Sequence, residues 1–262
     1  MRKLILLLTA AAIAPWHALA VEGAFHWNGR LSPGQEIEIK NINGAIRAEY
    51  TDGGEVQVDA TKTARRSDPN SVRVEAVPHG GGVTICAVYP NIDGRQNECK
   101  PGNEGRMNNR DNDVRVEFTV KVPRGVRLAA KTVNGNVVAN GLHSDIDAAT
   151  VNGEVKASSS ELVRAKTVNG SIDVKMGAVS WNDALKFETV NGSVDITMPP
   201  AISADVKAST VNGGISTDFP LTVSGKWGPK SVNGRIGGGG HELSIKTVNG
   251  GISLHSSSGR TI

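Results

Sequence analysis

The chain has 262 residues, of which 38% are hydrophobic, 21% are charged and only 4% are aromatic. Its 29 basic and 26 acidic residues give a net charge of +3, which falls to +1 without Arg2 and Lys3. Charges of both signs are interspersed, whereas a nucleic-acid-binding protein carries a concentrated basic face. The composition therefore disfavours nucleic acid as a partner.

Residues 1–20 have the organisation of a secretory signal peptide. Arg2 and Lys3 form a basic start, residues 4–14 are apolar, and Ala18-Leu19-Ala20 matches a cleavage site. The apolar stretch is shorter than the about 20 residues that a membrane-spanning helix needs. We therefore expect an exported mature chain that begins near Val21, has no transmembrane segment, and resides in the periplasm or at the cell surface.

Residues 21–125 are expected to form an irregular N-terminal β region, either a cap or the first coils of a repeat. Apolar and polar residues alternate, which predicts strands, at residues 56–60, 72–76, 83–87 and 114–122. A polar segment at residues 90–113 separates the last two strands. Cys86 and Cys99 are the only cysteines in the sequence. In an oxidising compartment they are expected to form a disulfide that pins the polar segment.

The segment 126–262 repeats the tetrad Thr-Val-Asn-Gly seven times, once with Ser in place of Thr, and a related Asn-Ile-Asn-Gly occurs earlier. The glycines of successive copies in this segment lie 16 to 22 residues apart, a spacing typical of short units that stack on one another. The Asn-Gly pairs, which we interpret as structural repeat positions, are Asn43 and Gly44, Asn134 and Gly135, Asn152 and Gly153, Asn169 and Gly170, Asn191 and Gly192, Asn212 and Gly213, Asn233 and Gly234, and Asn249 and Gly250.

Apolar residues alternate with polar ones on both sides of the tetrad. Val163 and Ala165 precede one copy, and Ile172 and Val174 follow it one residue out of phase. A bend at Asn-Gly, with Gly supplying backbone freedom, would keep both strands facing one interior. Thr and Asn are expected to line that interior. The Asn amides would then lie within hydrogen-bonding reach of the units above and below.

Two architectures fit this pattern. Asn-Gly between alternating strands is a strong signal for a two-residue hairpin, which would give an antiparallel meander or barrel. The two flanks of the tetrad differ systematically, however, and parallel stacking of identical units places like residues in ladders. The sequence therefore favours an all-β, right-handed, single-chain β-solenoid with an irregular N-terminal β-cap.

The residue between Thr and Asn is β-branched and apolar in every copy. Alternation points it away from the interior, so it is either covered at the corner or exposed as a stripe for interaction. The candidate stripe consists of Val133, Val151, Val168, Val190, Val211, Val232 and Val248.

The mature chain resembles the exported bacterial β-strand-repeat proteins called the “putative adhesin” family. The resemblance rests on the iterated Thr-Val-Asn-Gly followed by Ile or Val, and on Val-Lys-Val-Pro-Arg-Gly-Val at residues 120–126, and it covers roughly residues 30–256. It implies a β-solenoid and supplies no catalytic residues.

The sequence contains no nucleophile elbow, zinc-protease motif, phosphate loop or dinucleotide fingerprint. Carboxylates such as Asp173 and Asp195 could line one outer face, as in solenoid enzymes that act on polysaccharides, but their spacing does not predict a cluster. We expect a non-catalytic cell-envelope protein, adhesin-like or structural, without metal or cofactor, that binds a protein, a glycan or a sister molecule. The alternative is a lyase or glycosidase built on a β-solenoid.

Overall fold

A computed structural model describes residues 24–92, 94–228 and 230–257. The signal peptide expected at residues 1–20 lies outside these residues. Among the described residues, no helix is both long enough and apolar enough to span a bilayer. A 3₁₀ turn, η1 (Pro69–Ser71), lies between two of the strands.

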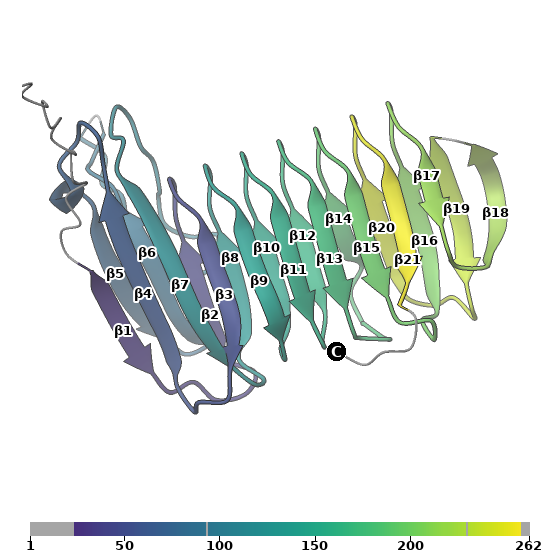
Figure 1. The fold of residues 1–262 in the computed structure, drawn as a ribbon, viewed down its shortest axis with the longest axis horizontal. Helices are drawn as coiled ribbons and strands as arrows, with labels where there is room; N and C mark the ends of the chain where they lie inside the picture. The colour runs from purple at the N-terminus through teal and green to yellow at the C-terminus, as the bar shows by residue number, and fades with distance from the viewer. Residues whose placement is uncertain (1–23, 93, 229, 258–262) are drawn as a thin grey trace, which may run out of the picture.

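The strands form two facing sheets that run along a rod (Figure 1). We call the ten-stranded sheet A and the eleven-stranded sheet B. The order in sheet A is β1 (Phe25–Gly29), β4 (Val56–Thr63), β7 (Arg115–Pro123), β3 (Ile46–Thr51), β9 (Val137–Leu142), β11 (Val155–Ser159), β13 (Ile172–Met176), β15 (Val194–Met198), β21 (Ile252–Ser256) and β17 (Ile215–Thr217). The order in sheet B is β18 (Leu221–Gly228), β19 (Ser231–Ile236), β16 (Ala204–Ser209), β20 (Glu242–Lys246), β14 (Leu185–Glu188), β12 (Val163–Lys166), β10 (Ile146–Ala149), β8 (Arg127–Lys131), β2 (Glu36–Lys40), β6 (Gly82–Val88) and β5 (Arg73–His79).

One coil of the rod consists of a strand in sheet B, a tetrad, and a strand in sheet A. Neighbouring coils pair in parallel with like residues opposite each other: Ile146 lies between Leu128 and Val163 in sheet B. In sheet A, Val155 lies between Val137 and Ile172. This parallel pairing supports the solenoid prediction and rules out an antiparallel meander through the regular coils.

The core lies between the sheets. Alternate residues of each strand are buried, as β13 and β15 show. A single apolar cluster extends from Ile37 to Leu254, and its largest fully buried side chains include Phe118 and Phe187. Each coil contributes only a thin apolar layer, so its stability depends on its neighbours.

At the N-terminal end, the chain order and the coil order differ. Strands β6 and β7 form a coil that stacks in parallel below β2 and β3, with the segment 89–114 in place of a tetrad. Beyond that coil the pairing becomes antiparallel, with β5 on β6, β4 on β7 and β1 on β4.

At the other end, the last coil lies inside the stack. Strands β20 and β21 insert between the coil of β14 and β15 and the coil of β16 and β17. The outer side of β16 is taken by β19, which pairs with it antiparallel, and β18 pairs with β19. Because β19 occupies that side, β20 reaches β16 from the inner side. The coils therefore do not stack in chain order at this end (Figure 1).

Candidate functional site

The tetrads that join sheet B to sheet A line up along one edge of the rod, which we call the corner. Bridges between successive Asn residues place the copies in the order Asn43, Asn134, Asn152, Asn169, Asn191, Asn249 and Asn212. Each tetrad residue has a different environment there.

The Thr side chains are buried, with 4–5% exposed. We count the coils in the order in which they stack, beginning with the coil of Asn43. Each hydroxyl donates to the carbonyl oxygen of the Gly in the coil that precedes it in this order. Thr150 Oγ1, for example, lies 2.8 Å from Gly135 O, and Thr167 Oγ1 lies 2.9 Å from Gly153 O. The hydroxyl therefore satisfies a carbonyl group that the sheet ladders leave free at the bend.

The corner glycines are required by close approach. A Cβ atom on Gly153 would overlap the carbonyl group of Gly135, and the same overlap recurs at each stacked copy. Among the described corners, only Gly44, Gly170 and Gly250 have φ in the left-handed region, between 121° and 157°. Backbone freedom, which we expected to explain these glycines, therefore accounts for only part of the repeat.

The Asn side chains form a continuous ladder on the outside of the rod. Each Nδ2 donates to the Oδ1 of the Asn in the preceding coil, at 2.8 Å from Asn169 to Asn152 and 2.7 Å from Asn191 to Asn169. From Asn134 onward, the ladder side chains are exposed. The expected contact between coils is present, but the prediction that Asn lines the interior is wrong, because Val and Asn both face outward at the bend.

The Val side chains divide into an exposed and a covered group. Val133 is only partly buried against the core, whereas Val232 is 2% exposed within β19. The exposed group has 37–53% of each side chain accessible and comprises Val151, Val168, Val190, Val211 and Val248.

The copy at Ser231–Gly234 is not a corner. It lies within β19, where Asn233 is opposite Lys207 and Gly234 is opposite Val206 in antiparallel register. The interpretation of Asn233 and Gly234 as repeat positions, and of Val232 as part of the stripe, is therefore wrong. A tetrad can also be accommodated inside a strand, because its Thr/Ser and Val have high strand propensity.

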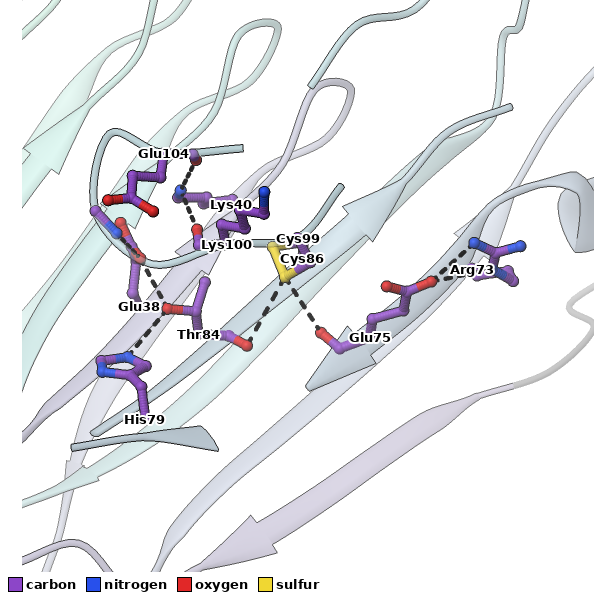
Figure 2. The surroundings of a disulfide bond; sticks show 11 residues. Glu38, Lys40, Arg73, Glu75, His79, Thr84, Cys86, Cys99, Lys100 and Glu104 are labelled. Atoms are coloured by element: carbon purple, nitrogen blue, oxygen red, sulfur yellow. Dashed lines mark hydrogen bonds and ion pairs between the residues drawn. A yellow bond between two sulfur atoms is a disulfide. The ribbon is translucent and has the colours of Figure 1, made fainter. Parts of the chain in front are cut away.

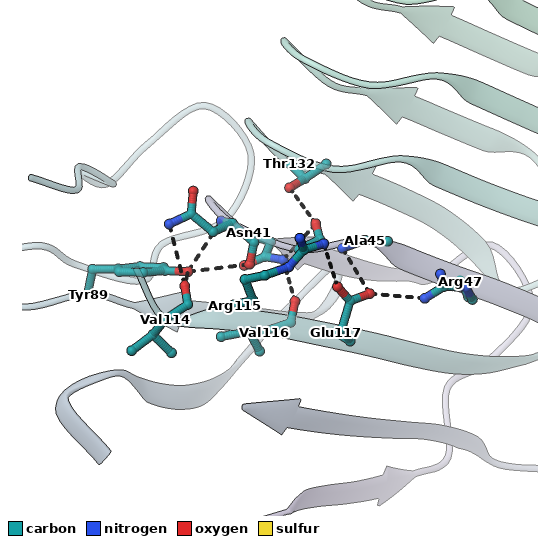
Figure 3. A network of polar contacts seen from close by, with 11 residues as sticks. Asn41, Ala45, Arg47, Tyr89, Val114, Arg115, Val116, Glu117 and Thr132 are labelled. Carbon is teal, nitrogen blue, oxygen red and sulfur yellow. Dashed lines mark hydrogen bonds and ion pairs between the residues drawn. The ribbon is translucent and has the colours of Figure 1, made fainter. Parts of the chain in front are cut away.

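The first tetrad is closed off by residues of the N-terminal coil (Figure 3). The Tyr89 hydroxyl donates to the carbonyl oxygen of Val114 at 2.9 Å and accepts the N–H of Asn43 at 3.2 Å. Asn41 Nδ2 donates to the carbonyl oxygen of Val116 at 2.7 Å. Burial raises the pKa of Tyr89 to about 12, so the phenol remains a neutral donor. No local sequence pattern indicates this role of Tyr89.

The disulfide between Cys86 and Cys99 ties the segment 90–113 to the outer face of sheet B (Figure 2). Both sulfurs lie in a small apolar cluster with Val88, against which Met107 packs. This pairing was predicted from the sequence, and the structure contains it.

Beside the disulfide, the same segment covers a buried carboxylate. Glu38 is 1% exposed and accepts bonds from Lys131 Nζ, Thr84 Oγ1 and the Gly102 N–H, each at 2.9 Å. Burial alone would raise the pKa of Glu38, but these three donors hold it below its ordinary value. Lys40 Nζ donates to the carbonyl oxygens of Lys100 and Glu104. Local sequence does not reveal this cluster, because alternation only places Glu38 and Lys40 on an outer face.

Catalytic chemistry finds little support in this arrangement. Asp173 and Asp195 lie opposite each other on β13 and β15, but Lys156 lies 3.8 Å from the Asp173 carboxylate. No group of three metal-ligating side chains occurs in the described part of the chain. His143 Nδ1 and Ser160 Oγ are 3.1 Å apart, without a carboxylate bonded to the imidazole among the described contacts.

Two parallel-rich sheets joined by a repeated corner define a solenoid-like repeat protein of the all-β class. The family model described as Toastrack DUF4097 matches residues 35–255. The chain therefore belongs to the Toastrack family.

Two solved structures resemble this fold at low sequence identity. A “putative cell adhesion protein” from Clostridium sporogenes is 12% identical, with 90% of this chain and 100% of that chain covered and a TM-score of 0.46. A “putative adhesin” from Bacteroides fragilis is 13% identical, with 89% and 97% covered and a TM-score of 0.34. No curated protein matches the sequence.

Proposed function

We propose that this protein is a non-catalytic, exported cell-envelope protein of adhesin-like type whose corner is an interaction surface. The observation that carries this proposal is the row of exposed Val side chains on successive coils. Val151, Val168 and Val190 are 37%, 39% and 40% exposed and recur at the strand spacing of about 4.8 Å. A continuous apolar row on a protein surface is typical of a binding site.

The corner is also held by hydrogen bonds between the coils, which favours binding. The buried Thr hydroxyl and the Asn amide on either side of each Val are bonded to the preceding coil, as Thr189 and Asn191 are around Val190. Binding of a partner would therefore cost little conformational entropy at this surface. The exposed Asn amides retain further donors and acceptors beside the apolar row, which suits a protein or glycan ligand.

Export and the finer architecture belong to the same proposal. The Cys86–Cys99 disulfide supports an oxidising compartment, in agreement with the signal peptide expected at residues 1–20. We further propose that the coils wind right-handed, and that residues 21–125 act as the cap and first coils of the regular part at residues 126–262.

The experiment replaces the exposed Val side chains and leaves the Thr and Asn hydrogen bonds between coils in place. Val151, Val168 and Val190 are changed together to Ser, and Val179→Ser serves as the control because it is 48% exposed away from the corner. Binding is measured on a glycan array and on immobilised wild-type protein. We expect the triple variant to lose at least about tenfold in affinity, since the substitutions remove three apolar contacts that a bound ligand would bury. A ligand bound equally well by wild type and triple variant would exclude the corner as the binding surface.

A reducing-sugar assay on the same glycans tests the alternative that the protein is a lyase or glycosidase. In that case, the neighbouring carboxylates of Asp173 and Asp195 would be the candidate catalytic groups. The proposal predicts no turnover. Turnover that Asp195→Asn abolishes, while Asp147→Asn leaves it intact, would replace the binding function with a catalytic one.

A further inference from the structure

Successive coils exchange one repeating set of hydrogen bonds at the corner. Between the last two, Thr210 Oγ1 donates to Gly250 O at 2.9 Å, and Asn212 Nδ2 donates to Asn249 Oδ1 at 2.7 Å. The Asn212 N–H donates to Val248 O at 2.7 Å and, in return, the Gly250 N–H donates to Asn212 O at 3.0 Å. In these four bonds, the coil of β16 and β17 gives three donors to the coil of β20 and β21 and receives one.

At the coil of β16 and β17, this set has no continuation within the described residues. In the other coils the Thr N–H also donates to the coil that follows, but the Thr210 N–H donates to Lys230 O at 2.9 Å. The other positions that a following coil would contact are the carbonyl groups of Val211 and Gly213, the Asn212 Oδ1, and the N–H groups of Gly213 and Ile215. In the other coils, the residue equivalent to Ile215 donates to the coil that follows, as Val155 N does to Ser171 O. Among the described residues, these five groups have no hydrogen-bond partner, so the end of the ladder presents a row of free donors and acceptors.

Exposure and pairing agree that this row is open. Val211 is 53% exposed, against 37–40% for the inner members of the exposed group. Gly213 is exposed, whereas Gly153 and Gly192 are half-buried. Strand β17 pairs with β21 on one side only, while sheet B continues past the same coil through β19 and β18 (Figure 1).

The opposite end of the corner is closed. Asn43 Nδ2 faces the carbonyl oxygens of Asn112 and Val114 at 3.4 Å, and the Tyr89 hydroxyl receives the Asn43 N–H. In a second copy of this chain, the donors of the stacked tetrads would be engaged within that copy in the same way. A sister molecule therefore cannot supply the missing set without unfolding part of itself.

We propose that β17 and the corner Thr210–Gly213 form a docking edge for an extended segment of another protein, which adds to sheet A as a parallel strand. The segment carries Thr-x-Asn-Gly, or donors equivalent to it: a hydroxyl for the Gly213 carbonyl and an amide for Asn212 Oδ1. Gly must follow the amide, because in every other coil a Cβ there would overlap the carbonyl below. Strand addition of this kind takes affinity from main-chain bonds and specificity from the side chains.

Two features of β17 favour this use. Its residues Ile215, Ser216 and Thr217 include neither Pro nor a charge, although natural edge strands commonly use these to prevent pairing. Ile215 is only partly buried and packs against the core, so an added strand would also cover apolar surface. This inference goes beyond the proposed function and does not depend on the Val row.

The test uses the full mature protein and a labelled peptide spanning residues 247–256, which contains one tetrad and the sheet A strand that follows it. We expect saturable binding by fluorescence anisotropy. The matched peptide with Gly250→Ala should bind about tenfold more weakly or not at all, because its methyl group meets the Gly213 carbonyl. Absence of saturable binding by the unmodified peptide overturns the proposal, as does equal binding of the two peptides.

Two protein variants locate the peptide. Ile215→Pro removes an N–H on the open side of β17 and should abolish binding, provided that the melting temperature of the variant is unchanged. Asn212→Cys should form a disulfide with a peptide carrying Asn249→Cys, whereas Asn182→Cys, an exposed site elsewhere, should not. If the peptide still binds the Ile215→Pro variant, or if no selective cross-link forms, the peptide does not bind at β17 but displaces the chain's own last coil. Either result would refute the docking edge.

If the Ile215→Pro variant is unstable, the cross-link alone decides whether the peptide binds at β17.

Sedimentation of the wild type tests whether the occupant is a second copy of this chain. The wild type would then associate with itself in a concentration-dependent way, and Asn212→Cys capped with a bulky thiol reagent would not. That result would show that a second copy fills the edge, and the assignment to another protein would be wrong.

Discussion

Glycine recurs at the corner because each copy lies against the carbonyl group of the copy before it. Gly153→Ala tests this reason directly, since Gly153 does not have a left-handed φ and its Cβ would overlap the Gly135 carbonyl. We expect a loss of about 3 kcal/mol of stability in chemical denaturation, as for other overpacked sites. Gly214→Ala is the control, because a Cβ there meets nothing within 4 Å. Equal denaturation midpoints for the two variants would contradict the close-approach explanation.

Asparagine recurs because its amide is both donor and acceptor, which lets one residue type continue a ladder through successive coils. In Asn169→Asp, the carboxylate cannot donate to Asn152 Oδ1, 2.8 Å away in the wild type. We expect this change to cost about 1 kcal/mol more than Asn182→Asp, in line with one lost hydrogen bond. The readout is the difference in melting temperature, and identical values for the two variants would show that the ladder contributes nothing to stability.

At the scale of elements, the segment 90–113 is an enlarged corner that is held by the disulfide and by hydrogen bonds to the buried Glu38 and to Lys40 on β2. The carboxylate of Glu38 has a pKa below the ordinary 4.5 in the folded protein. The resulting stabilisation is complete above the pKa of the unfolded chain and is lost as the pH falls through the lower folded value.

We therefore expect Glu38→Gln to destabilise the protein at pH 7 by about 2 kcal/mol, the scale of a hydrogen bond to a charged group. The difference from wild type should shrink as the pH is lowered below 4.5. Glu49→Gln, on the outer face of β3 and exposed, is the control with no expected effect. Urea denaturation as a function of pH is the measurement. A Glu38→Gln effect that is constant down to pH 2 would show that the charge of Glu38 is not what stabilises the segment.

The strands could be predicted from the sequence because their burial alternates, as it does at Val163 and Ala165. Parallel stacking could be predicted because the two flanks of the tetrad differ. The placement of Asn was wrong because a bend interrupts the alternation, so neighbouring residues such as Val168 and Asn169 both face outward. The Glu38 cluster could not be predicted, since contacts over 46 to 93 residues leave no local pattern.

At the scale of the whole molecule, the order of the coils could not be predicted because the tetrads are interchangeable. Any Thr-x-Asn-Gly offers the same donors and acceptors, so local sequence allows the coil at Thr210 to stack on that at Thr189 or on that at Thr247. The antiparallel strand β19 decides between these arrangements by occupying the outer side of β16. The last coil in the chain, β20 and β21, thus lies between two earlier coils. There Trp181 Nε1 donates to Glu242 O at 2.9 Å.

This interchangeability predicts that the rod can close over a missing coil. In a chain ending at residue 241, we expect β16 and β17 to move onto β14 and β15, because Thr210 and Asn212 can donate to Gly192 and Asn191 as Thr247 and Asn249 do in the full chain. In the full chain Asn191 and Asn212 flank Asn249, and two strand spacings of about 10 Å separate them, which is too far for a disulfide. The pair Asn191→Cys and Asn212→Cys should therefore cross-link in the truncated chain and not in the full chain, while Asn191→Cys with Asn249→Cys cross-links in the full chain as the control. If the truncated pair stays reduced and residues 204–217 lose protection from hydrogen exchange, coil order is fixed by contacts outside the tetrads, such as the one between Trp181 and Glu242.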